Sequence, residues 1–214
     1  MRLGMIPLWL LIAATPPMAR GQEPRLLGRV PDPARAQVDA ILDAARVRGL
    51  PVEPLLDRAL EGATKGAPPA AIVAAVTRLR DELVVVSRAF GETASTAELT
   101  AGASALRAGA GADDLARLRR LRPGRPLTVA AAVMADLVAA GVAADTAAGA
   151  VLALAQNADD ADYIAFRRNV QRDIELGASP AAALAVRIRS ATDLSSTPGS
   201  ETMPGTGASR KRKP

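Results

Sequence analysis

The chain of 214 residues is long enough to form a domain with its own core, and it contains neither histidine nor cysteine. These absences exclude disulfides and remove the commonest general base, the commonest zinc ligands and the thiolate nucleophile. The formal net charge of +5 comes mostly from the two ends of the chain. Bulk charge therefore indicates no nucleic-acid groove on the folded part.

Residues 1–21 are typical of a secretory signal peptide. Arg2 precedes an apolar run from Leu3 to Ala14, and the small residues Ala19 and Gly21 precede the expected cleavage point after Gly21. The run is shorter than the roughly 20 residues needed to span a bilayer. We therefore expect export to the periplasm or the extracellular space; an uncleaved anchor and a cytoplasmic protein are the alternatives. Residues 22–31 are expected to be an N-terminal linker.

Glycine recurs at positions that end one helical pattern and precede the next. A glycine can adopt the left-handed conformation that closes a helix, and a following proline or short polar residue suits the first turn of the next helix. These joints predict short antiparallel helices. They are Gly49-Leu50-Pro51, Gly66-Ala67-Pro68, Gly111-Ala112-Asp113, Gly141-Val142-Ala143 and Gly177-Ala178-Ser179-Pro180.

Apolar residues at helical spacing lie between these joints. Ser95 and Glu98 form a candidate capping box. Leu127 to Ala140 is apolar nearly all round, which favours a central helix, and Tyr163 and Phe166 have core spacing. In chain order, the predicted helices begin at or next to Pro33, Val52, Pro68, Ser95, Asp113, Leu127, Val142, Asp159 and Ser179.

The predicted fold is all-α: antiparallel helical hairpins forming a bundle or a short solenoid of about eight to nine helices. One helical domain is expected over residues 32–192, with a candidate sub-boundary near 122–126, where Pro123 and Gly124 interrupt the pattern. The joints are too unevenly spaced for a strict repeat. From residue 193 to 214 serine, threonine, proline and glycine predict a disordered basic tail.

No motif in the chain names a reaction, and we predict no catalytic residue, no cofactor and no metal. Asp159, Asp160 and Asp162 could be a carboxylate cluster for a hard cation. The cluster lacks the glycine and distal glutamate of a calcium loop, and acidic residues at a helix start interact favourably with the helix dipole. We therefore favour a helix-start role for them.

Two groups of basic residues are candidate anion-binding sites. Bidentate phosphate contacts by the first group compete with a solvated helix face that has intrahelical partners such as Asp113 for Arg117. The second group, in the tail, would attract an anionic membrane surface or another polyanion without specificity. The residues are Arg117, Arg119, Arg120, Arg122 and Arg125 in the first group, and Arg210, Lys211, Arg212 and Lys213 in the second.

These observations favour a non-catalytic, exported helical interaction module of the bacterial envelope that binds a protein partner or its own copy. A carrier of an apolar or lipid ligand, enclosed by the helices between Leu127 and Ile174, is one alternative. Polyanion or membrane-surface binding through the basic tail is another, and a hydrolase without histidine ranks last. No specific nucleic-acid partner is predicted.

Overall fold

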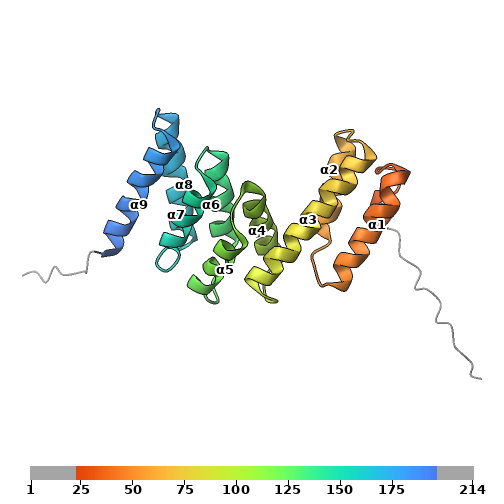
Figure 1. The fold of residues 1–214 in the computed structure, drawn as a ribbon, viewed down its shortest axis with the longest axis horizontal. Helices are drawn as coiled ribbons and strands as arrows, with labels where there is room; N and C mark the ends of the chain where they lie inside the picture. The colour runs from red at the N-terminus through yellow and green to blue at the C-terminus, as the bar shows by residue number, and fades with distance from the viewer. Residues whose placement is uncertain (1–22, 197–214) are drawn as a thin grey trace, which may run out of the picture. The chain divides into compact units, whose positions relative to one another are not determined.

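The computed structural model describes residues 23–196, and this part of the chain is helical throughout, with no strand (Figure 1). The all-α prediction is confirmed, and the helix count agrees with the expected eight to nine. The elements are η1, a 3-10 helix (Pro24–Leu26), α1 (Asp32–Val47), α2 (Glu53–Thr64), α3 (Pro69–Phe90), α4 (Thr96–Ala108), α5 (Ala112–Leu121), α6 (Thr128–Ala139), α7 (Ala144–Leu154), α8 (Asp160–Glu175) and α9 (Pro180–Ser196).

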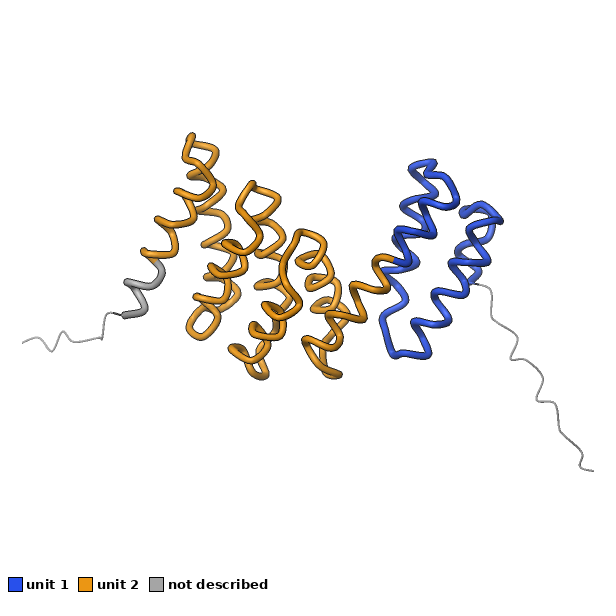
Figure 2. Tube along the Cα trace, in the orientation of Figure 1, with its two compact units in different colours: residues 1–77 blue, residues 78–214 orange. Residues whose placement is uncertain are grey.

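The chain divides into two compact units between Thr77 and Arg78, inside α3 (Figure 2). The segment 122–126, predicted as a candidate sub-boundary, lies within the second unit. The predicted tail begins at residue 193, yet α9 continues to Ser196, and the rest of the tail lies outside the described residues.

In the first unit, α1 packs against α2 through a single apolar stripe on each helix. Both helices have exposed polar residues on the opposite side, as the helical spacing predicts. The described part of the predicted linker forms η1, which packs against α2 and buries Leu26 and Val30. The stripe residues are Ala34, Val38, Ile41, Leu42 and Ala45 in α1 and Leu55, Leu56 and Ala59 in α2.

The second unit is a two-layer stack of helices. In one layer α6 packs between α4 and α8, and in the other α7 packs between α5 and α9. The α6–α7 and α8–α9 contacts join the layers. The C-terminal part of α3 belongs to this unit, where Val86 and Phe90 lie against Gly102 of α4. Helices α8 and α9 are therefore the last pair of the stack.

A repeat of 32 residues underlies this stack. The residues that precede α4, α6 and α8 are Ser95, Leu127 and Asp159, which are evenly spaced along the chain. The uneven joints concealed this spacing, because α8 is longer than α4 and α6. The second helices of the three hairpins begin at Ala112, Ala144 and Pro180 and are not evenly spaced, so the repeat is regular in its first helix and is not strict over the whole hairpin.

The same hydrogen bond closes the helix at all five predicted joints. The amide of the residue that follows the left-handed glycine donates to a carbonyl five residues earlier, at 2.9–3.0 Å, as in Val142 to Leu137. Gly49, Gly66, Gly141 and Gly177 have positive φ, as expected. In the remaining joint the left-handed residue is Gly109 rather than Gly111, which instead precedes the first turn of α5.

Candidate functional site

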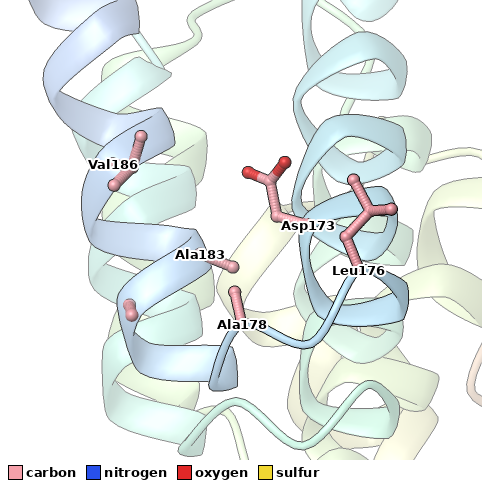
Figure 3. A pocket seen from close by; sticks show the side chains of 6 residues that line it. Asp173, Leu176, Ala178, Ala183 and Val186 are labelled. Carbon is pink, nitrogen blue, oxygen red and sulfur yellow. The ribbon is translucent and has the colours of Figure 1, made fainter.

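A groove between α8 and α9, at the end of the helix stack, is the candidate site (Figure 3). Its volume is about 300 Å³. We call it the α8–α9 groove and define it by its lining residues, Asp173, Leu176, Ala178, Ala182, Ala183 and Val186. Figure 3 shows Asp173 and Leu176 along one helix, Ala183 and Val186 along the other, and Ala178 at the joint.

The local sequence explains why a groove forms here. Gly177 turns the chain with φ of 101°, and Ser179 Oγ accepts a hydrogen bond from the amide of Ala182 to start α9 after a joint of only four residues. Alanines at positions 181–183 then provide the first turns of α9, and their short side chains leave space between the helices. A joint this short keeps the two helices antiparallel and adjacent.

Two large apolar side chains at the groove remain in water. Leu176 is 80% exposed and Val186 is 50% exposed. Leu176 follows the last helical residue of α8 and is off the buried stripe of that helix, and Val186 lies next to inward residues of α9. Exposed apolar residues that gather at a depression are typical of a surface that binds another molecule.

The polar edge of the groove is an ion pair that joins the two helices. Arg187 donates from Nε and Nη2 to the two carboxylate oxygens of Asp173, at 2.7 and 2.6 Å. The hydrogen bond from Arg187 holds the pKa of the Asp173 carboxyl below its ordinary value. The carboxylate is therefore charged at neutral pH, and both of its oxygens already accept hydrogen bonds from Arg187. This arrangement fits a structural role in joining the two helices better than a role as a general base.

Within residues 23–196, no three acidic side chains are arranged to hold a metal ion. Asp159 and Asp162 instead form a capping box, in which each carboxylate accepts the backbone amide of the other residue at 2.9 Å. Asp160 accepts a hydrogen bond from Arg122 at 3.2 Å. All three acidic side chains of the candidate cation cluster thus have protein donors at the start of α8.

The candidate anion-binding arginines in and just after α5 do not form one exposed surface. Arg119 donates to the buried Glu98 at 2.7 Å and lies over the ring of Phe90. Arg125 donates to the carbonyl of Ala158 at 2.7 Å. Arg117 and Arg120 are exposed, so anion binding by these two stays a prediction. Arg210, Lys211, Arg212 and Lys213 lie outside the described residues.

Arg122 was expected to face outward, and that expectation was wrong. Its side chain is 1% exposed, it donates to the carbonyl of Ala158 at 2.5 Å, and it lies over the ring of Tyr163. Arg122 follows the last residue of α5 and has non-helical dihedral angles, so helical periodicity does not determine its direction. Burial raises the pKa of the Tyr163 phenol to about 12, and its hydroxyl donates to the carbonyl of Val151.

Glu98 joins neighbouring repeats. Its carboxylate is buried and accepts hydrogen bonds from Ser95, from Arg119 and, at 3.0 Å, from the amide of Leu127 before α6. Ala130, three residues after Leu127, has no side chain that could accept this amide, so the preceding repeat supplies the acceptor. Burial favours the neutral acid, but these hydrogen bonds outweigh it and hold the pKa of Glu98 below its ordinary value.

Sequence analysis did not single out Leu176 or Val186. The sequence did contain a signal for them, because each is a large apolar residue that lies outside the buried stripe of its helix.

Among the helices of residues 23–196, none has the length and apolar character that crossing a bilayer requires. No protein-family model, curated protein or solved structure matches the chain.

Proposed function

We propose that the protein is a non-catalytic helical repeat module of the bacterial envelope that binds a protein partner through the α8–α9 groove. The observation that carries this proposal is the exposure of Leu176 and Val186 at the open end of a regular helix stack. Export rests on residues 1–21, which lie outside the described part of the chain.

The groove could contribute substantially to binding. Complete burial of a leucine or valine side chain is worth about 1.5–3 kcal/mol. Scaling by the exposed fractions of 80% and 50% leaves about 2–4 kcal/mol for the pair. Such a contribution suits an apolar centre surrounded by polar contacts, which is the usual anatomy of a protein interface.

A protein partner fits this surface better than a small apolar ligand. A carrier encloses its ligand and buries most of the ligand's surface. The α8–α9 groove is open, and its two largest apolar side chains extend into solvent at its edges. A lipid bound here would remain partly in water, whereas a partner helix could cover both side chains at once.

The test is a capture experiment with groove variants. The purified protein would be cross-linked in an envelope extract, alone and as Leu176→Ser and Val186→Ser variants. The matched control is Ile164→Ser, which removes an exposed apolar side chain from α8 outside the groove. We expect both groove variants to lose the captured partner and the control to retain it. Equal yields from all proteins with unchanged circular dichroism would refute the proposal.

A further inference from the structure

Large exposed apolar side chains are confined to the two ends of the described chain. Val47 at the end of α1 is 89% exposed, Leu27 lies shortly before α1, and the others belong to α8 and α9. Between residues 53 and 154, from α2 to α7, no large hydrophobic side chain is exposed. Exposed apolar side chains on the last helix pair indicate a helix stack without a polar cap, and α8 and α9 are such a pair in the second unit.

The stack itself shows what is missing at its last joint. A Cβ added at Gly109 would lie 3.1 Å from Ala144, the first residue of α7. The equivalent atom at Gly141 would lie 3.2 Å from Pro180, the first residue of α9. The joints inside the first two hairpins of the stack are thus covered by the start of a helix from the following repeat, whereas the joint at Gly124, between α5 and α6, is not. At Gly177 no atom lies within 4 Å of the corresponding position, so the last joint is uncovered.

We propose that a second copy of this chain covers the α8–α9 groove, bound head to tail through the Val47 patch, which we define as Arg46, Val47 and Arg48. This inference rests on the proposed function, because it names the partner of the same groove. The end of α1 of one copy then lies against the last hairpin of another. Val47 would contact Leu176 in the groove.

Charge next to the two apolar residues favours this pairing. Arg48 follows Val47 and Glu175 precedes Leu176, and both charged side chains are exposed. Opposite charges beside an apolar contact steer and orient association. A symmetric contact between two α8–α9 grooves would instead leave Val47 in water. A head-to-tail contact is heterologous, so it produces a closed ring or an open filament.

The absence of cysteine permits a decisive cross-linking test. The full chain would be expressed, with any processing that follows, as Val47→Cys and as Leu176→Cys, one variant carrying a tag that changes its mass. Mild oxidation of the mixture should give a disulfide-linked heterodimer. Each variant alone should give none. As a control, Ala153→Cys, exposed on α7, should not link to Val47→Cys.

Sedimentation measurements on chains without cysteine complete the test. The mass of the wild type should rise with concentration, and Val47→Ser and Leu176→Ser should each weaken self-association at least tenfold. Homodimers of Leu176→Cys alone, or no cross-link with a monomer at every concentration, would overturn the inference. If capture from the envelope extract still depended on Leu176, the proposed function would stand with a different protein as the partner.

Discussion

Two helical glycines should respond in opposite directions to the same substitution. Replacing a glycine in a helix interior by alanine stabilises a protein by about 0.5–1 kcal/mol, because the unfolded chain loses conformational freedom. Gly149 in α7 is exposed, and no atom lies within 4 Å of the position that a Cβ would occupy. Gly149→Ala should therefore stabilise the protein by this amount.

At Gly102 in α4 the same methyl group has no room. It would lie 2.5 Å from Cγ1 of Val86 and 3.0 Å from Cε2 of Phe90, both of which are buried. A valine side chain is stiff about χ1, so relief requires α3 and α4 to move apart. Overpacking of this kind costs about 1–3 kcal/mol, which outweighs the helix gain. We expect Gly102→Ala to lower the free energy of unfolding by about 1–2 kcal/mol.

Urea unfolding followed by far-ultraviolet circular dichroism would measure both variants against the wild type. The two should differ by about 1.5–3 kcal/mol, with opposite signs relative to the wild type. A Gly102→Ala protein as stable as Gly149→Ala would refute the close packing of α4 on α3. It would also show that helix propensity alone controls both sites.

Three further results are expected, two of them from pairs of variants. Glu98→Ala should lose about 3–4 kcal/mol of stability in urea unfolding, because it leaves the buried Leu127 amide without an acceptor; Asp136→Ala, which breaks an exposed ion pair, should lose at most about 1. Because the folded pKa of Glu98 is lowered, its contribution is present above pH of about 4.3 and is lost as the pH falls through the folded value. The difference between wild type and Glu98→Ala should therefore shrink in acid, and a constant difference would contradict the assigned hydrogen bonds. Arg122→Ala should lose about 3 kcal/mol in thermal unfolding and the exposed Arg117→Ala about 0.5 or less, so equal losses would contradict the burial of Arg122.

Helix starts and stops were predicted well because their causes lie within a few residues. The capping boxes at Ser95 and Asp159 require only a side chain and an amide three residues apart. The helix-ending glycines likewise depend on backbone freedom at a single position. The choice between Gly109 and Gly111 was missed because either residue can take the left-handed conformation. The tertiary structure distinguishes the two glycines, because Ala110, the residue after Gly109, is buried.

The repeat and the site depend on contacts that no local pattern contains. The amide of Leu127 finds its acceptor 29 residues away in Glu98, and Arg122 finds the carbonyl of Ala158 36 residues away. Helical periodicity gives the face of a residue on its own helix, but not what lies opposite that face.

The sequence by itself determined that this protein is all-helical, where most of its helices begin and end, and that histidine and cysteine chemistry is excluded. Only the tertiary structure decided which helices share a layer, that Arg122 is buried, and that Leu176 and Val186 remain exposed beside a groove. The physical reason is that hydrogen bonding and capping are satisfied locally, whereas the burial of a side chain depends on helices distant in the chain.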